Sequence, residues 1–302
     1  MNRAIKRIAE RTLISGGASR LGRSRLRGRV LILAYHNVVP TGLEPSGDLN
    51  LHLPQHEFAA QLDVLRRYHD VVPLTSLLER GPAGGRLRVA ITFDDAYAGA
   101  LAAGVRELVE RGMPATIFVA PGLLGGITWW DALADPTRGL DPGFRTRALN
   151  ELAGKGDAIL GETQLTRGAT PAHDSYRIGT IAELERAAAQ PGITLASHTW
   201  SHPNLCALSR DELVRELSTS LQWLQAHHPS ALAWLTYPYG LWSNDVANAA
   251  ANVGYAAALR VDGGWFDPQA APSRYALPRL NIPAGISLDG FALRLAGIGS
   301  QA

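Results

Sequence analysis

The chain has 302 residues, of which 46% are hydrophobic and 19% charged, and this composition excludes a disordered or collagen-like protein. This length allows one large α/β domain or two small ones. The single cysteine, Cys206, excludes both an intramolecular disulfide and a cysteine-based metal site. The net charge of +2 is unevenly distributed, because residues 1–30 contain nine Lys and Arg against one acidic residue, Glu10. Of the 29 basic and 27 acidic residues in the chain, 20 and 26 lie beyond position 30, so the remainder is mildly acidic.

Residues 1–28 are predicted to form a basic, helical segment ahead of the main domain. Charged residues interrupt its apolar ones, unlike the continuous apolar core of a signal peptide, and no apolar run in the chain has the ~20 residues of a membrane span. The segment has no interleaved aromatic residues, so we expect a solvated helix or a weak contact with an anionic membrane surface rather than nucleic-acid binding. We therefore expect a cytoplasmic protein, at most peripheral at the inner membrane, with no obligate protein partner.

Short apolar runs alternate with helical patterns along residues 29–302, which is typical of a parallel sheet built from strand–helix units. Strands are predicted at residues 30–35, 70–73, 87–93, 115–120, 193–197, 232–237 and 255–259. Helices are predicted at 56–68, 98–112, 144–152, 180–190, 209–227 and 243–253; Ser209 and Glu212 mark the start of the fifth with a capping box ahead of a leucine stripe. Residues 121–192 are rich in Gly, Pro and Thr, as in a cap or lid. Together these features indicate one α/β domain, a (β/α) barrel of about seven strands.

Polar residues follow four of the predicted strands. These are His36 after the first strand, Asp94 and Asp95 after 87–93, His198 and His202 after 193–197, and Pro238, Tyr239 and Gly240 after 232–237. The carboxyl ends of parallel strands meet at one edge of a barrel or sheet, so we expect these residues at a common mouth. Taken singly, each has a simpler interpretation, because an Asp pair after a strand is typical of a turn or helix cap and a lone histidine of a structural hydrogen bond.

The spacing of His198 and His202 allows two imidazoles to converge on one cation. It is not the metalloprotease helix, because Thr199 replaces the required Glu and Pro203 disfavours a helix. Two neutral imidazoles and one carboxylate are a common ligand set for a catalytic zinc, and one Asp of the pair would then be free for proton transfer. A cation lowers the pKa of a water ligand, and a nearby carboxylate can take the proton as the water attacks a carbonyl. The set predicts hydrolysis of an ester or amide.

At these residues the sequence resembles the polysaccharide deacetylase family, carbohydrate esterase family 4. The first three motifs of that family correspond to T-F-D-D at Thr92–Asp95, H-T-W-S-H at His198–His202 and Y-P-Y-G at Tyr237–Gly240. The resemblance covers roughly residues 29–285, and A-Y-H-N-V at Ala34–Val38 resembles a first-strand feature of one bacterial branch, often linked to exopolysaccharide or cell-envelope glycan genes. It implies a distorted (β/α) barrel and the removal of N- or O-acetyl groups from sugar polymers with a divalent metal.

The resemblance also implies roles for individual residues. Asp95, His198 and His202 would be the metal ligands, and Asp94 the general base. The backbone N–H of Tyr239 would stabilise the oxyanion of the tetrahedral intermediate. Zinc is the default metal for two histidines and one aspartate, with cobalt, nickel or manganese as alternatives. The expected substrate is an acetylated sugar polymer, oligosaccharide or glycan precursor, with N-acetyl groups favoured.

Two departures from the family pattern concern proton transfer. Many members have an arginine two residues before the proline of the third motif, where this chain has Thr236. Many also end with a Leu-x-His that protonates the leaving amine, but no histidine of this chain lies beyond His228. We therefore hypothesise that His36 acts as the general acid and that Arg279 pairs with Asp94. The alternative for Arg279 is a salt bridge at the surface or rim.

Aromatic residues on the predicted loops are candidates for stacking on sugar rings. Trp129, Trp130 and Trp242 are the preferred candidates, together with Tyr239, and burial in the core is the alternative for each.

Two other functions are compatible with the sequence. The same metal site could serve a deacylase acting on a non-sugar amide or imide. The two departures from the family pattern would also fit a catalytically silent glycan-binding protein, although all four residues of the metal and base set are present.

Overall fold

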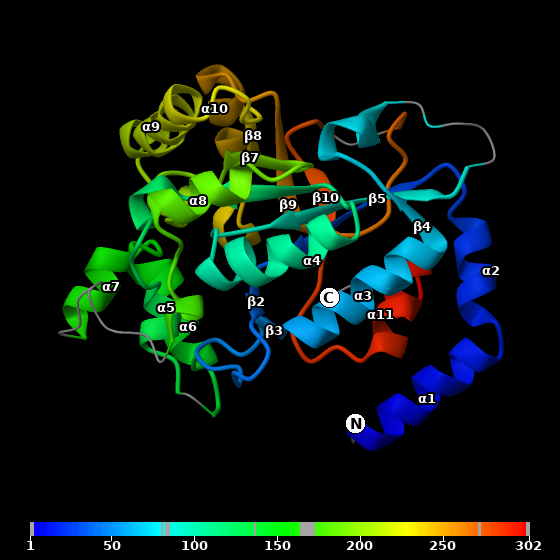
Figure 1. Ribbon diagram of the computed structural model, residues 1–302. Helices are drawn as coiled ribbons and strands as arrows, with labels where there is room; N and C mark the ends of the chain where they lie inside the picture. Colours follow the sequence, from blue (N-terminus) through cyan, green and yellow to red (C-terminus); the bar gives the residue numbers. More distant parts are fainter. Residues whose placement is uncertain are drawn as a thin grey trace.

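The computed structural model describes residues 3–79, 81, 85–135, 137–163, 173–270 and 273–299, with side chains from Ile5 onward (Figure 1). In this part of the chain a parallel β-barrel is surrounded by helices, and two helices precede it, α1 (Arg3–Ser15) and α2 (Ala18–Arg25). None of the helices described is both long and apolar enough to cross a membrane.

Seven parallel strands close the barrel, in the order β1, β5, β6, β7, β8, β9 and β10. They span Val30–Tyr35, Leu87–Phe93, Ala115–Val119, Ile193–Ser197, Trp234–Thr236, Ala257–Gly263 and Leu277–Asn281, respectively. The ring closes because β1 pairs along its whole length with β5 and, on its other side, with β10. The predicted α/β barrel of about seven strands is confirmed.

One predicted strand lies outside the ring, and one strand of the ring is missing from the sequence prediction. β4 (His69–Val71) pairs with the first half of β5 and adds an eighth strand beside the barrel. The apolar pattern of β10 is interrupted by Pro278 and Arg279, which conceals this strand in the sequence. Arg279 can occupy the closing strand because a carboxylate inside the barrel neutralises it. A short parallel pair, β2 (Asn37–Val39) and β3 (His52–Pro54), follows the end of β1.

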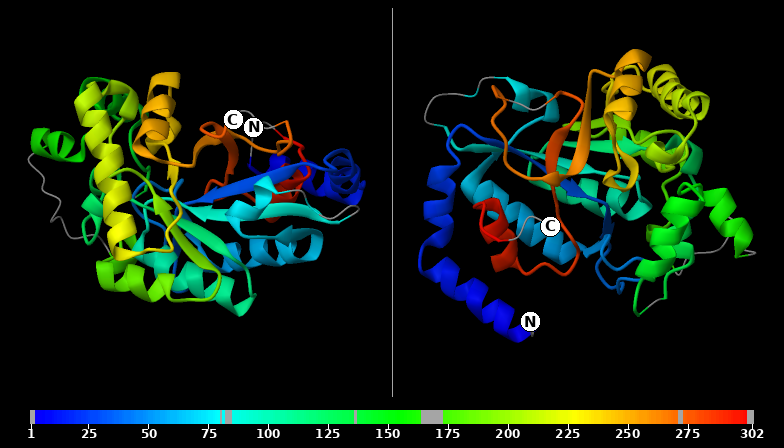
Figure 2. Two further views of the ribbon diagram at one scale, coloured as in Figure 1. Left: turned by 90° about the horizontal axis from the view of Figure 1, so that it is seen from above. Right: turned by 180° about the vertical axis from the view of Figure 1, so that it is seen from behind.

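Helices cover the outside of the barrel (Figure 2). The main ones are α3 (Gln55–Tyr68), α4 (Val105–Glu110), α8 (Ile181–Ala188), α9 (Arg210–His227), α10 (Asn244–Val253) and α11 (Leu288–Leu295). The predicted capping box and buried leucine stripe are both present in α9. The helix predicted at 98–112 instead begins with a π-helical turn at Ala100–Gly104. Its backbone runs very close to β2, since a Cβ atom on Gly99 would lie 2.4 Å from the carbonyl oxygen of Val38.

Within the predicted insertion at 121–192, a small helical layer lies beside the barrel, on the left in Figure 1, whereas α8 covers the barrel itself. The layer contains α5 (Trp129–Ala132), α6 (Pro142–Glu151) and α7 (Gly156–Glu162), while residues 164–172 lie outside the described part. These helices share an apolar cluster formed by Trp129, Trp130, Ala148, Ile159 and Leu160. The layer therefore has its own core, and it holds side chains near the mouth of the barrel.

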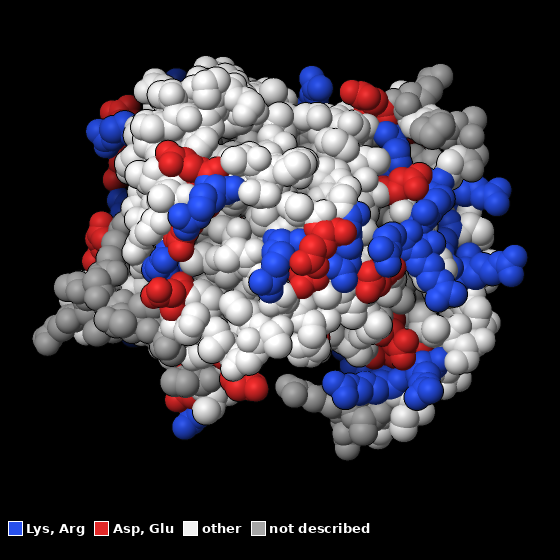
Figure 3. Space-filling view, in the orientation of Figure 1, with Lys and Arg blue, Asp and Glu red and all other residues white. Residues whose placement is uncertain are grey.

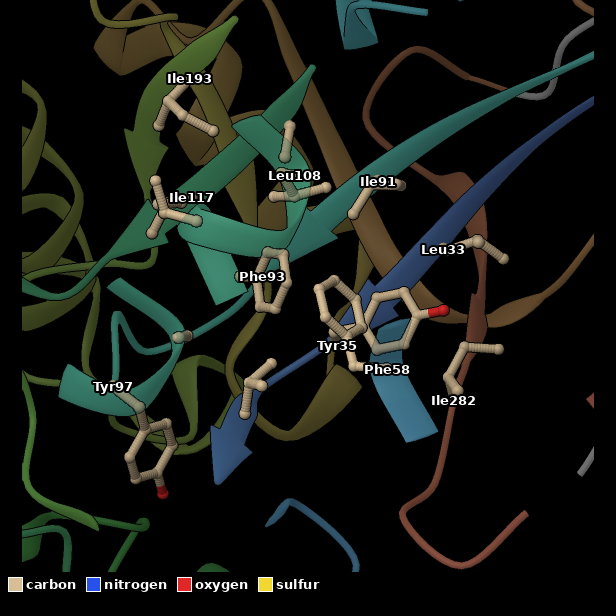
Figure 4. Packing of buried hydrophobic residues seen from close by; sticks show 14 of the residues in the cluster. Leu33, Tyr35, Phe58, Ile91, Phe93, Tyr97, Leu108, Ile117, Ile193 and Ile282 are labelled. Atoms are coloured by element: carbon tan, nitrogen blue, oxygen red, sulfur yellow. The ribbon is translucent and has the colours of Figure 1, made fainter. Parts of the chain in front are cut away.

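Side chains of each strand alternate between the barrel interior and the surrounding helices. Tyr35 and Phe93 point outward and pack on Phe58 of α3, with the rings of Tyr35 and Phe58 5.2 Å apart (Figure 4). The intervening residues point inward, where a second cluster includes Val30, Ile32, Ala90, Phe118, Ala196, Leu259 and Leu277. The same alternation, continued to the carboxyl ends of the strands, determines which polar side chains enter the barrel.

Candidate active site

On several strands, the last residues that face the barrel interior are polar, and they lie at the same end of the barrel. Steps of two residues lead from Ile32 to His36, from Ala90 to Asp94, from Ala196 to His198 and from Leu277 to Arg279. These four side chains line one pocket of about 180 Å³ together with Asp95, His202 and Tyr239. The residues predicted to meet at a common mouth are therefore brought together by the period of two along each strand.

Three buried side chains of the pocket form a triangle of ligand atoms. Nε2 of His202 lies 3.0 Å from Nε2 of His198, and Oδ1 of Asp95 lies 3.4 Å from the first and 3.5 Å from the second. Ligand atoms about 2.0–2.2 Å from a tetrahedral zinc are about 3.3–3.6 Å apart, so the triangle has nearly the dimensions of such a site. Asp95, His198 and His202 are the one group of this kind in the part of the chain that is described.

The protonation and the hydrogen bonding of these side chains also suit a divalent cation. Burial lowers the pKa of both histidines, which keeps the imidazoles neutral. Nδ1 of His198 lies 2.9 Å from the carbonyl oxygen of Thr236, so the N–H at that position can donate and leave the Nε2 lone pair directed to the site. Oδ1 of Asp95 is buried without a hydrogen-bond partner among the described residues, and burial with the charges of Asp94 and Asp131 raises its pKa. A cation at the centre of the triangle would satisfy this oxygen.

The loop between the two histidines is held in an unusual backbone conformation. Thr199 and His202 have φ values of 67° and 60°, in the left-handed region that costs most residues energy. The carboxylate of Glu216, on α9, accepts hydrogen bonds from the N–H groups of Trp200 (3.0 Å) and Ser201 (2.9 Å). This side chain supports the loop from behind, so that His202 points back toward His198.

Asp94 is bound by a fully buried arginine. Nη1 of Arg279 donates to Oδ1 of Asp94 at 2.8 Å and Nη2 to Oδ2 at 2.7 Å, while Nε donates to the carbonyl oxygen of Arg260. Burial alone would raise the pKa of Asp94, but the charge and hydrogen bonds of Arg279 outweigh it and hold the pKa below its ordinary value. The pairing hypothesised from the sequence is present, and the alternative of a surface or rim salt bridge is excluded because Arg279 is 0% exposed.

His36 lies half-buried on the wall of the same pocket. Burial lowers its pKa to about 4, with Arg279 acting in the same direction and the charge of Asp94 opposing both. The ring is therefore neutral near pH 7. As hypothesised from the sequence, His36 would be a general acid, but a neutral ring has to receive a proton before it can donate one.

Tyr239 lines the pocket and lies in the turn after β8. Its φ of 58° is left-handed, and its ring contacts that of His202 at 4.5 Å between centroids. No acceptor for the N–H of Tyr239 is found among the described residues. The adjacent position requires glycine, because a Cβ atom on Gly240 would lie 2.3 Å from the Val261 side chain and its φ of 71° is left-handed. Tyr239 therefore combines a place in the pocket lining with a backbone donor that has no partner among the described residues.

Comparison with known proteins agrees with this arrangement. The sequence profile of the family described as polysaccharide deacetylase matches residues 82–258, which is more than half of the chain. The chain belongs to the polysaccharide deacetylase family. A chitooligosaccharide deacetylase from Sinorhizobium fredii is 34% identical over 76 residues. That match spans only 25% of this chain and 35% of the relative, so it concerns a part of each protein.

Solved structures of polysaccharide deacetylases share the barrel. The Streptococcus pyogenes deacetylase PplD in complex with acetate superposes with a TM-score of 0.61 at 18% identity, covering 87% of this chain and 96% of that one. IcaB from Ammonifex degensii gives 0.62 at 16% identity over 88% and 96% of the two chains. A polysaccharide deacetylase from Bacillus cereus gives 0.63 at 15% identity over 88% and 69%. At these identities the likeness establishes the fold.

The tryptophans of this chain are placed differently from the expectation. Trp130 lines the pocket, with its ring 4.9 Å from that of His202. Trp129 is not among the lining residues; it packs against the ring of Trp130, and its Nε1 donates to the Tyr239 hydroxyl at 2.9 Å. Trp242 is half-buried and is not a lining residue, but it stacks on Tyr237, which is one. For Trp129 the structure shows core packing, whereas stacking of the half-buried Trp242 on a sugar stays a prediction.

Sequence reasoning missed a buried hydrogen-bond network that fixes Trp130. Its Nε1 donates to the hydroxyl of Tyr97 (2.8 Å), which donates to Oδ2 of Asp131 (2.5 Å). Oδ1 of the same carboxylate lies 2.9 Å from Nε2 of His52. Arg145 also went unrecognised, although it lines the pocket. These residues come from separate loops and from the insertion, and the sequence carries no spacing signal that would connect them.

Proposed function

We propose that this protein is a divalent-metal-dependent hydrolase that removes acetyl groups, N-acetyl groups in particular, from a glycan or a glycan precursor. The observation that carries the proposal is the buried triangle of Asp95, His198 and His202 next to an aspartate held by Arg279, all lining one pocket. Zinc suits two imidazoles and one carboxylate best, with cobalt, nickel and manganese as alternatives.

The reaction is hydrolysis, in which a C–O bond to water forms and the C–N bond to the sugar nitrogen breaks, releasing acetate and an amine. Asp95, His198 and His202 would hold a divalent cation, which would supply Lewis acidity toward water and the acetyl carbonyl. Asp94 takes the proton of the attacking water as general base. The two hydrogen bonds from Arg279 fix its carboxylate plane, and each oxygen keeps a second lone pair for that proton.

The remaining roles follow from the pocket wall. The backbone N–H of Tyr239 donates to the oxygen that becomes negative in the tetrahedral intermediate. His36 begins neutral, because its pKa is about 4, so it receives the proton taken from water and then delivers it to the leaving nitrogen. This order of events replaces the simpler one in which His36 starts the cycle protonated.

The pocket favours a small acyl group at its base and a sugar at its mouth. Its volume of about 180 Å³ suits an acetyl group and little more of the substrate. Trp130 offers an aromatic face on one wall, and Arg145 and Asn281 offer polar groups. The relatives include a chitooligosaccharide deacetylase and a polysaccharide deacetylase, which supports an N-acetylated glycan as substrate for this chain as well. A cytoplasmic location stays a prediction.

Elemental analysis of the purified protein, combined with acetate release from chito-oligosaccharides, tests the proposal. We expect about one divalent metal ion per chain and an Asp94→Asn variant that keeps the metal but loses turnover by about 10²–10⁴-fold. Asp245→Asn, at an exposed position on α10, serves as the matched control and should keep full activity.

Two outcomes would contradict the proposal. Absence of bound metal and of acetate release from any acetylated glycan would favour a silent glycan-binding protein. Bound metal with hydrolysis of small amides or imides but not of glycans would favour the non-sugar deacylase.

A further inference from the structure

The first helix of the chain is oriented with its apolar side toward solvent. Ile5, Ile8 and Leu13 of α1 are 58%, 67% and 45% exposed, whereas Glu10, on the opposite side, is 9% exposed. A surface helix of a globular protein normally packs its apolar side on the core. Leu21 on α2 is also exposed, so four of the eight exposed large hydrophobic side chains among the described residues lie in this short N-terminal part.

Specific contacts hold the two helices in this orientation. The carboxylate of Glu10 accepts a hydrogen bond from the hydroxyl of Ser287, at the start of α11, at 2.5 Å. Gly22 of α2 lies against Ala296, because a Cβ atom there would come within 2.2 Å of its carbonyl oxygen. Arg23 stacks over the ring of Tyr68 at 4.3 Å, and Leu26 is buried. None of these contacts uses Ile5, Ile8 or Leu13, so the apolar side of α1 remains exposed.

The exposed apolar side is bordered by positive charge. On α1, Lys6 and Arg11 lie on either side of the stripe of Ile5, Ile8 and Leu13, at positions set by 100° per residue. Further exposed cations of this part are Arg7, Arg20, Arg25, Arg27 and Arg29. In Figure 3 Lys and Arg gather at the right and lower right, over α1 and α2. Residues 1–30 have nine basic residues and one acidic residue, while the rest of the chain has more acidic than basic residues.

We propose that α1 and α2 dock this protein on the surface of an anionic lipid bilayer. An apolar stripe bordered by Lys and Arg is the pattern of a helix that lies in the membrane interface, where apolar side chains enter the acyl boundary and cations meet the headgroups. The 13 residues of α1 are about 20 Å long, enough to lie along a bilayer but too short to span it. A second copy of the chain is the less suitable partner, because it would bring two strongly basic surfaces together.

Vesicle co-sedimentation tests the proposal with the full chain. The probes are vesicles of pure phosphatidylcholine and vesicles in which about one third of the lipid is phosphatidylglycerol. We expect binding to the anionic vesicles alone, and weaker binding at high salt. Ile5→Ser/Ile8→Ser should lower the partition coefficient by at least about tenfold, since each variant site loses the burial of a branched aliphatic side chain.

A matched control uses apolar residues with similar exposure elsewhere. Ile181 and Val214 are 48% and 41% exposed on α8 and α9, so Ile181→Ser/Val214→Ser should bind vesicles like the wild type. Arg11→Gln/Arg20→Gln should weaken binding and reduce its salt dependence. Thermal unfolding of each variant shows that the fold is kept.

Three results would overturn the proposal. One is wild-type protein that stays in the supernatant with anionic vesicles. Another is an Ile5→Ser/Ile8→Ser protein that binds as well as the wild type. The third is a dimer in light scattering that the same two substitutions convert to a monomer without any vesicle binding, which would assign the apolar side of α1 to a second copy of the chain.

Discussion

Replacing Arg279 by methionine tests whether the barrel closes around an ion pair. Arg279 is 0% exposed and Asp94 is 3% exposed, so the substitution leaves a carboxylate buried without its cation. Removing one partner of a buried pair costs about 3–5 kcal/mol of unfolding free energy, because the remaining charge is neither hydrated nor paired. We expect the Arg279→Met protein to lose an amount in this range near neutral pH.

A double variant separates the unpaired charge from the loss of packing. Asp94→Asn/Arg279→Met has no charge at either position, so it should be more stable than Arg279→Met by roughly 2 kcal/mol. Arg260→Met is the control for the loss of an arginine from this part of the barrel. Its guanidinium pairs with Asp262 at a partly exposed site, so we expect a loss below about 1 kcal/mol.

Urea unfolding followed by tryptophan fluorescence measures these free energies, provided that the dependence on urea is the same for all four proteins. Two results would refute the reasoning. In the first, Arg279→Met unfolds within about 1 kcal/mol of the wild type. In the second, the double variant is no more stable than the single one, which would show that the buried charge of Asp94 is not what Arg279 compensates.

Three further predictions concern the metal site and His69 of β4, the strand beside the barrel. His202→Ala removes one of three ligands, so elemental analysis should find no stoichiometric metal, and full metal content would contradict the ligand set. Glu216→Gln should lower metal affinity about 10–100-fold in competition with a chelator, because its carboxylate holds the loop that carries His202; unchanged affinity would show that the loop keeps its shape unaided. His69 is buried with no partner for either ring nitrogen among the described residues, and burial lowers its pKa to about 3, with Arg23 and Arg86 acting in the same direction. Below the ordinary pKa of 6.5 the unfolded chain binds a proton that the folded chain excludes, so the wild type loses up to about 1.4 kcal/mol of stability per pH unit as the pH falls. Between neutral pH and about pH 5, the unfolding free energy of His69→Phe, measured with urea, should fall by about 2 kcal/mol less than that of the wild type. An equal fall in both proteins would contradict this account.

The fold could be predicted from sequence where the local pattern and the three-dimensional environment agree. Strand β1 is an uninterrupted apolar run, and β5 and β7 are mostly apolar, because most of their residues are buried; the predicted limits of all three coincide with the observed ones. The closing strand β10 did not stand out, since Arg279 looks like a surface residue until its partner is known. In contrast, β4 was predicted from its apolar run, but it lies beside the barrel rather than in the ring.

The candidate site could be predicted to a similar extent. Asp95, His198 and His202 carry their chemistry in residue type and spacing, so sequence alone pointed to a metal. The burial of Trp129 was not accessible in that way, because it depends on the packing of α5 against Tyr239, more than a hundred residues away. The low pKa of His36 likewise arises from burial, which local sequence does not express.

The position of Arg279 in the chain has a consequence for the order of folding. Asp94 is made early in synthesis, but its cation follows 185 residues later, on the strand that pairs with β1 to complete the ring. Before β10 has folded onto the sheet, the carboxylate of Asp94 is more stable in contact with water, because burying an unpaired carboxylate is unfavourable. Burial of Asp94 therefore becomes favourable only when β10 has paired with β1. The ion pair makes closure of the barrel depend on its last strand.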